Sequence, residues 1–81
     1  MNNSEALKKE IPELVTKHRK KSGLSQAQLA KLAGVGKTAV FDVEHGKTTV
    51  QMDTLLRILD VLNIEVQISS PLLKAIKEMQ K

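Results

Sequence analysis

Four small residues divide the middle of the chain into two short helices and a corner: Ser25, Gly34, Gly36 and Gly46. Ser25 is a good N-cap, because its hydroxyl accepts a hydrogen bond from a backbone N–H group that the first helical turn leaves unpaired. Gly34 can adopt the left-handed conformation that ends a helix, and Gly36 precedes the next one. The spacing therefore predicts one helix over residues 26–33 and a second over about 37–45, which Gly46 ends.

The apolar residues of these two helices recur at helical spacing and predict one buried face on each. On the first helix they are Leu29, Leu32 and Ala33, and Ala30 is small enough for another helix to cross closely. The second helix would bury Val40 and Val43, either alone or together with Ala39. Its opposite face then carries five outward residues: Lys37, Thr38, Phe41, Asp42 and His45. This arrangement is a helix-turn-helix, which makes DNA the leading candidate partner.

The two helices resemble the helix-turn-helix domain of the XRE family, which includes phage repressor and Cro proteins. The residues that carry the resemblance lie at the helix ends and crossing point: Ser25, Gln26, Ala30, Gly34, Val40, Glu44, Gly46 and Lys47. The resemblance covers residues 11 to about 63 and implies an all-α, five-helix-type domain. It also implies a buried ion pair between Arg19 and Glu44. Loss of one partner of such a pair is costly, so we expect Arg19 to be structural.

The same resemblance, taken position by position, assigns base reading to the second helix, which would lie in the major groove. The implied base readers are Lys37, Thr38 and Asp42, with Ala39 and Phe41 lining the same face. Asp42 stands where amides are common in the family. It would accept a hydrogen bond from cytosine N4, pair with a neighbouring lysine, or repel phosphate. Phe41, the single aromatic residue, is either a core residue or, as we favour, a partly exposed contact for a thymine methyl group or sugar.

Contacts to the phosphate backbone are expected from residues beside the reading helix: Gln26, His45, Lys47 and Thr48. The net charge of +4 suits a polyanionic partner. Most of the excess lies in residues 1–22, around the basic run 17–21 at the end of the preceding helix. This run is either a solvated helix face or a further phosphate contact.

The flanks of the motif predict further elements. Residues 1–10 are polar, and Pro12 disfavours a helical conformation at Ile11, so we expect a flexible N-terminal arm followed by a helix over about 12–21. After the loop that follows Gly46, a further helix is marked by Met52, Leu55, Leu56, Leu59 and Leu62, and Asn63 can close it. The helix-turn-helix domain is accordingly placed at residues 11–63.

Residues 64–69 alternate apolar and polar side chains and predict one β-strand, with Ile64, Val66 and Ile68 on one face. An unpaired strand is unstable, so we expect it to pair with the same strand of a second copy across a two-fold axis. Ser70 and Pro71 interrupt the strand. Residues 70–81 then form a short helical or disordered tail that needs a surface to lie on.

A phage-repressor-like domain followed at once by a strand and a short tail resembles the HipB-type antitoxins. That resemblance implies a homodimeric, autoregulating repressor that binds operator DNA and a HipA-like toxin kinase. Two alternatives remain open. One is a stand-alone dimeric transcriptional regulator, and the other is a protein-interaction module whose helix-turn-helix is structural.

Several other functions find no support in the sequence. The chain has no cysteine and two histidines, so we expect no metal, no cofactor and no disulfide. The run from Gly34 to Thr38 ends like a phosphate-binding loop, but that motif needs a glycine where Lys31 stands. We identify no catalytic residues and expect no enzyme activity. No apolar run of the length of a membrane span or signal peptide is present, so a cytoplasmic protein is expected.

Overall fold

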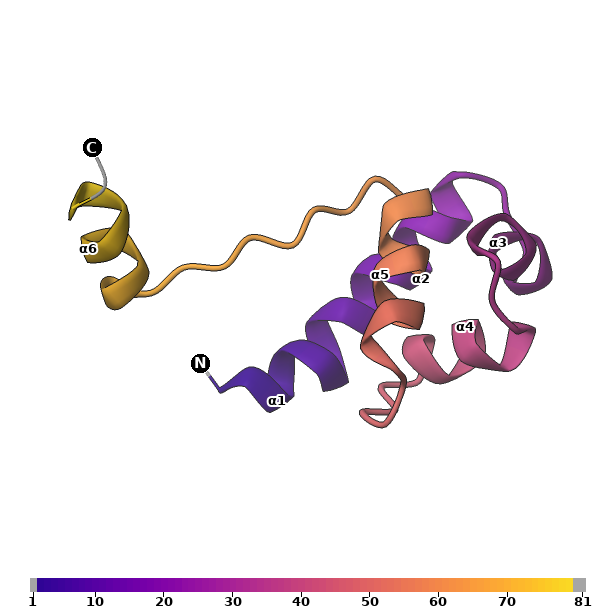
Figure 1. Cartoon of the computed structure of the whole chain (residues 1–81). Coiled ribbons are helices and arrows are strands. Elements are labelled where there is room, and N and C mark those ends of the chain that lie inside the picture. The colour runs from indigo at the N-terminus through magenta and orange to yellow at the C-terminus, as the bar shows by residue number, and fades with distance from the viewer. Residues whose placement is uncertain (1, 80–81) are drawn as a thin grey trace.

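Four helices pack around a shared apolar core in the computed structural model, which describes residues 2–79 (Figure 1). They are α2 (Ile11–Lys21), α3 (Gln26–Ala33), α4 (Lys37–Glu44) and α5 (Met52–Val61). Helix α3 packs against α4 and α5, and α2 packs against α4. The core is made of aliphatic residues: Val15, Leu29, Ala30, Ala33, Val40, Val43, Ile58, Leu59 and Leu62. The described residues are thus mainly helical, as an all-α helix-turn-helix domain requires.

The corner between α3 and α4 has the backbone that its small residues predict. The Ser25 hydroxyl accepts a hydrogen bond from the Gln28 N–H group at 3.0 Å, and the Gln28 side-chain oxygen accepts one from the Ser25 N–H group at 2.8 Å. This reciprocal capping box fixes the start of α3. The helix ends at Gly34, whose φ of 71° lies in the left-handed region. Gly36 then precedes α4, so the predicted bounds of both helices are confirmed to within one residue.

The apolar residues that mark α5 in the sequence do not all lie in the core. Ile58, which is not among them, is fully buried, whereas Met52 and Leu56 are exposed. Leu55, Ile58, Leu59 and Leu62 follow the i, i+3, i+4, i+7 pattern, and this arc faces the bundle. Leu56 lies to the side of the arc and Met52 at the end of the helix. Leu32 on α3, predicted to be buried, is 63% exposed.

The prediction that Pro12 interrupts the N-terminal helix is wrong. Residues 3–10 are helical, as α1 (Asn3–Glu5) and the π-helical turn η1 (Ala6–Glu10), and they continue into α2. Ile11 is helical, with φ −64° and ψ −47°, and its N–H group donates to the carbonyl of Ala6, five residues back. The wide π turn lets the chain accommodate the Pro12 ring, which would collide with a preceding carbonyl in a regular helix. Residues 3–10 are therefore helical, and the flexibility expected of the arm stays a prediction.

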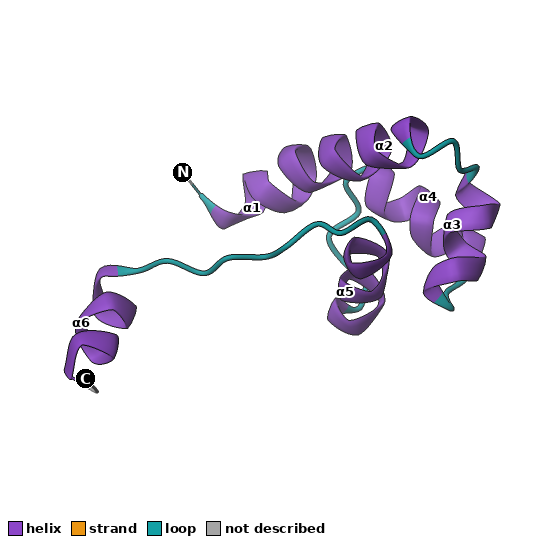
Figure 2. Cartoon of the chain, turned by 90° about the horizontal axis from the view of Figure 1, so that it is seen from above, coloured by secondary structure: helices purple, strands orange, loops and turns teal. Residues whose placement is uncertain are grey.

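The segment after α5 leaves the bundle without forming a strand within the described chain. Asn63, with a left-handed φ of 57°, closes α5 as predicted. Residues 64–70 are then extended but belong to no sheet among residues 2–79, and α6 (Pro71–Met79) follows. Figures 1 and 2 both show α6 standing away from the four-helix bundle. The single chain supplies no second strand, so the backbone groups of residues 64–69 have no ladder to join.

Candidate nucleic-acid interface

The outer face of α4 presents the residues predicted to read DNA bases. Lys37 and Thr38, in the first turn, are exposed, and Phe41 is 47% exposed. Asp42 and Ala39 are half-buried at the edges of this face. Val40 and Val43 point into the core instead. Burial of these two valines therefore orients α4 so that its first turn and its outer face are open to a ligand.

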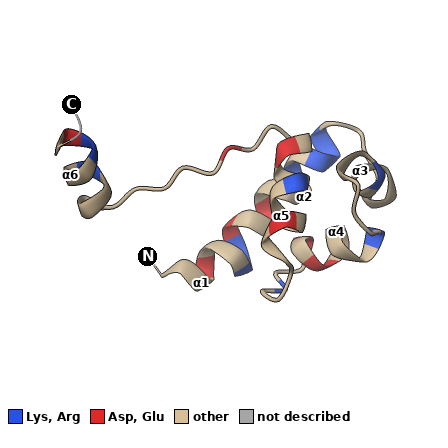
Figure 3. Cartoon of the chain, viewed as in Figure 1, with Lys and Arg blue, Asp and Glu red and all other residues tan. Residues whose placement is uncertain are grey.

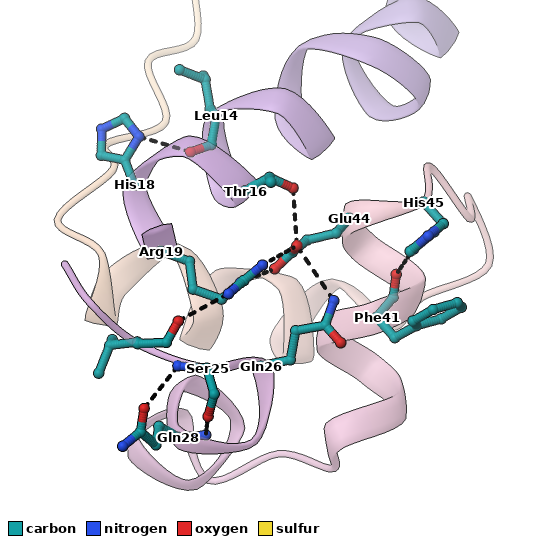
Figure 4. A network of polar contacts seen from close by, with 11 residues as sticks. Leu14, Thr16, His18, Arg19, Ser25, Gln26, Gln28, Phe41, Glu44 and His45 are labelled. Carbon is teal, nitrogen blue, oxygen red and sulfur yellow. Dashed lines mark hydrogen bonds and ion pairs between the residues drawn. The ribbon is translucent and has the colours of Figure 1, made fainter. Parts of the chain in front are cut away.

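Phe41 and His45 form a stacked pair on this face. Their ring centroids are 3.9 Å apart, and the ring planes are inclined by 21°. The His45 Nδ1 atom lies 2.8 Å from the Phe41 carbonyl oxygen (Figure 4). Because a carbonyl oxygen only accepts hydrogen bonds, Nδ1 carries the hydrogen and Nε2 is the ring nitrogen left for another partner. The phenyl ring is thus a surface feature, and the histidine ring helps to hold it.

Asp42 and Lys47, predicted to contact bases and phosphate respectively, are brought together. The Lys47 Nζ atom lies 3.5 Å from an Asp42 carboxylate oxygen, and the Lys47 N–H group donates to the Asp42 carbonyl at 3.0 Å. The lysine side chain remains 57% exposed, whereas that of Asp42 is 22% exposed. Of the three roles considered for Asp42, pairing with a neighbouring lysine is the one for which the unbound protein provides a contact.

Arg19 and Glu44 form a bidentate ion pair beneath the interface (Figure 4). The Arg19 Nε and Nη2 atoms donate to the two carboxylate oxygens of Glu44 at 2.7 and 3.0 Å. Arg19 Nη1 donates to the Leu24 carbonyl at 2.9 Å. The two side chains are only 12% and 4% exposed. The pair joins α2 to the end of α4 and fixes the position of that helix.

Two neutral side chains complete the shell around Glu44. The Thr16 hydroxyl donates to Glu44 Oε1 at 3.0 Å, and the Gln26 amide donates to the same oxygen at 3.4 Å. Burial alone would raise the pKa of Glu44, but the hydrogen bonds from Arg19, Thr16 and Gln26 and the guanidinium charge hold this pKa below its ordinary value. Glu44 is therefore kept as a carboxylate, which suits a structural role.

Gln26 and Thr48, both predicted to contact phosphate, lie in different surroundings. The Gln26 amide group is turned inward to Glu44, and the residue is half-buried. Thr48 is exposed in the loop after α4. That loop begins at Gly46, whose φ is 77°, and a β-carbon at this glycine would lie 2.8 Å from the Lys8 carbonyl oxygen. The loop that carries Lys47 and Thr48 is therefore seated against the N-terminal helix.

Charge is unevenly distributed around the bundle, as Figure 3 shows. Blue segments mark the end of α2 and the start of α4, and red in α4 marks its acidic residues. Lys17 of the basic run is paired with Glu13 at 2.6 Å on the exposed surface of α2. Lys20, Lys21 and Lys37 are exposed and form no ion pair within residues 2–79. These lysines remain available to an anionic partner.

Sequence reasoning missed three contributions to this region. Gln28 completes the capping box, and its position three residues after Ser25 is the signal that would have revealed it. Thr16 bonds to Glu44 from one turn before Arg19, a position that carries no motif of its own. The approach of Lys8 to Gly46 joins residues far apart in the chain, and no local pattern announces it.

The described residues contain no helix with the length and apolar character needed to cross a membrane. The three predicted strand residues, Ile64, Val66 and Ile68, lie outside the α4 interface on the extended segment. Val66 and Ile68 are 58% and 78% exposed. The structure thus brings the predicted DNA-contacting residues together around α4 and leaves the predicted dimer residues apart from them.

Comparison with known proteins agrees with this geometry. The family model described as helix-turn-helix matches residues 16–68. An uncharacterised HTH-type transcriptional regulator of Sinorhizobium fredii is 39% identical over 62 residues, which cover 76% of this chain and 82% of that protein. A second, from Haemophilus influenzae, is 43% identical over 49 residues, which cover 60% of this chain and 49% of that protein. The chain belongs to the helix-turn-helix family of transcriptional regulators, of the XRE type.

Proposed function

We propose that the chain is a sequence-specific transcriptional repressor that reads operator DNA with α4. The observation that carries this proposal is the outer face of α4, where Lys37 and Thr38 are exposed in the first turn while the buried Arg19–Glu44 pair fixes the end of the helix. A rigid helix with open polar residues at its N-terminus fits the major groove. In this role the chain binds DNA in the cytoplasm and does not act as an enzyme.

Each side chain of the interface has a distinct task in this proposal. Lys37 donates to guanine O6 or N7, and Thr38 bonds to a base edge or offers its methyl group to thymine. The exposed phenyl ring of Phe41 contacts a thymine methyl group or a sugar. Asp42 holds Lys47, which with Thr48 and His45 reaches phosphates, and Ala39 leaves space beside the bases. The side-chain amide of Gln26 is turned toward Glu44, so among the proposed phosphate contacts that of Gln26 is the weakest.

The functional unit in this proposal is a dimer paired through residues 64–69. Ile64, Val66 and Ile68 share one face of the extended segment because side chains alternate along it. A two-fold axis through Val66 sets Val66 against Val66 and Ile64 against Ile68, which keeps apolar residues opposite each other. It also sets Glu65 against Gln67. A shift of the axis to residue 65 would set two glutamates against each other, so the Val66 register is favoured.

Base preference tests the assignment of α4 most sharply. Sites selected by the wild-type protein from random duplex DNA should share a motif, and Thr38→Ala should change the preferred base at one position of each half-site. Lys47→Ala should weaken binding to all sequences alike and reduce the slope of log affinity against log salt by about one. Lys74→Ala, on the distant α6, is the matched control. Equal effects of Thr38→Ala on every sequence would contradict the proposal.

An antitoxin role is the finer form of this proposal, and its support is the order of elements: a repressor-like domain, an extended segment and a short terminal helix. In this form the repressor regulates its own gene and binds a HipA-like toxin kinase. A HipA-like kinase gene beside this one, with a product that co-purifies with the chain, would support it. If no HipA-like kinase gene lies beside this one, the stand-alone dimeric regulator becomes the favoured function. If the protein binds no promoter DNA at low salt, the remaining hypothesis is a protein-interaction module whose helix-turn-helix is structural.

A further inference from the structure

Helix α6 is a well-formed amphipathic helix whose apolar face is largely exposed in the described chain. The Ser70 hydroxyl accepts a hydrogen bond from the Leu73 N–H group at 2.8 Å, which caps the helix, and Pro71 occupies its first position. Leu72, Ile76 and Met79 are 70%, 41% and 84% exposed. A nine-residue helix is marginal on its own in water, so this face calls for a surface to cover it.

A matching hollow lies on α5 and the turn that follows it. It has a volume of about 470 Å³ and is lined by Leu56, Leu59, Asp60 and residues 63–66. Leu56 on its rim is 42% exposed. Helix α6 of the same chain does not fill this hollow, because the extended segment carries it away from α5 in both views (Figures 1 and 2).

In the register proposed for the dimer strand, α6 of one copy lies beside the hollow of the other copy. With Val66 on the two-fold axis, Ser70 of one copy lies opposite Leu62 of its partner. The next residue begins α6, so the helix starts beside the end of the partner's α5. The extended segment thus places the unpartnered helix of each copy next to the open hollow of the other. This step rests on the dimer of the proposed function.

Charge favours the same contact. Asp60 on the wall of the hollow and Glu65 beside it are acidic. Lys77 borders the apolar face of α6 next to Leu73, since the two residues are four positions apart in the helix. A helix seated on the hollow by its apolar face would therefore bring a lysine toward two carboxylates.

We infer that two copies exchange their C-terminal helices, each α6 docking by Leu72, Ile76 and Met79 on the hollow at the end of the partner's α5. The exchanged helices would close both ends of the intermolecular ribbon. They would also bury apolar surface that each chain leaves open.

Cysteine cross-linking tests this exchange cleanly because the chain has no cysteine of its own. Leu56→Cys and Ile76→Cys proteins are mixed and treated with a flexible bis-maleimide, and the covalent pair is detected by denaturing electrophoresis. Val66→Cys linked to itself tests the strand separately. Thr38→Cys mixed with Ile76→Cys is the control, because α6 must leave the DNA-reading face of α4 open.

The expected result is a cross-link in the Leu56→Cys and Ile76→Cys mixture and in Val66→Cys, with little in the Thr38→Cys control. A cross-link in Val66→Cys alone would overturn the exchange and leave the dimer standing. A monomeric wild type with no cross-link in Val66→Cys would overturn both. A link formed only within one chain of the Leu56→Cys/Ile76→Cys double variant would show that α6 folds back, which also overturns the exchange.

Dimer affinity provides a second measurement that needs no cross-link. Leu72→Gln removes an apolar contact from α6. Lys74→Gln introduces the same residue on the polar face of the helix and serves as the control. Sedimentation equilibrium should show dimerisation weakened by about tenfold or more for Leu72→Gln, from the apolar burial that is lost, and little changed for Lys74→Gln. Equal dimer affinity for both variants would contradict the exchange.

Discussion

The four-helix bundle and the C-terminal segment after Asn63 carry similar apolar residues but use them in opposite ways. In the bundle, Val15 and Ile58 are fully buried. In the C-terminal segment, Val66, Ile68 and Leu72 are 58%, 78% and 70% exposed. Both regions have apolar residues at regular spacing, so neither the content nor the spacing of these residues distinguishes the two regions. The difference is that the bundle buries its apolar residues within one chain, whereas of the described C-terminal segment only Ile64 is packed against the core.

This contrast bears on how a small regulator divides its tasks. The bundle must present α4 in a fixed orientation, which the core and the Arg19–Glu44 pair provide. Under the proposed function, the extended stretch and the capped helix of the C-terminal segment gain their stability from a second copy. The proposal therefore assigns DNA reading and association to separate regions, and a variant in one region should leave the other intact.

The largest expected effect comes from Arg19→Ala. This change leaves the Glu44 carboxylate buried without its cation, and loss of one partner of a buried pair costs about 3–5 kcal/mol. Urea denaturation followed by circular dichroism should show a correspondingly lower free energy of unfolding or an unfolded protein. Lys17→Ala, which breaks the exposed pair with Glu13, should change it little. Equal losses in the two variants would mean that the Arg19–Glu44 pair does not hold the bundle.

Removal of one isoleucine from each region compares them directly. Ile58→Ala should lower the free energy of unfolding by about 2–5 kcal/mol, because a fully buried side chain leaves a cavity. Ile76→Ala, made in a protein kept monomeric by Val66→Asp, should leave it almost unchanged. Chemical denaturation of both in that monomeric background is the measurement. A large loss from Ile76→Ala would show that α6 packs on its own bundle.

Gly46→Ala probes how the N-terminal helix, unlike α6, is attached to the bundle. The new β-carbon would sit 2.8 Å from the Lys8 carbonyl oxygen at a φ of 77°, and we expect a loss of about 1–3 kcal/mol in unfolding free energy. Gly23→Ala is the matched control, since its φ is 73° but no atom lies within 4 Å of the added carbon. The excess loss at Gly46 measures the contact with Lys8, and identical losses would rule that contact out.

The smallest effect is a pH dependence of bundle stability. The pKa of Glu44 in the folded protein lies below its ordinary value, so the carboxylate contributes stability at neutral pH. That contribution should fall as the pH drops below about 4.3, the ordinary glutamate value, and through the folded pKa. Glu44→Gln should flatten the dependence of unfolding free energy on pH. Glu13→Gln, where Lys17 lowers the pKa of an exposed carboxyl, should alter it much less.

Local sequence signals predicted the bundle well where the responsible physics is itself local. Ser25, Gly34 and Gly36 set the ends of α3 and α4 through caps and backbone conformation. Arg19 and Glu44 were found through the family resemblance, since nothing near either residue announces a partner 25 positions away.

What the sequence could not predict depends on neighbours in space. The choice between Leu56 and Ile58 for the core depends on which side of α5 faces α3 and α4. The prediction at Pro12 failed because the restriction on the residue before proline is a preference, and Ile11 adopts the helical conformation in spite of it. The strand over residues 64–69 remains a prediction, because its partner would come from another chain.

A nuclease footprint on the DNA upstream of the protein's own gene tests the central claim, that two copies read operator DNA with α4, most directly. The wild-type protein should protect a palindromic site with two half-sites about 34 Å, or one helical turn, apart. Val66→Asp should lose this paired protection while its bundle stays folded. Absence of protection by the wild type at low salt, or the same paired footprint from the Val66→Asp monomer, would contradict the account.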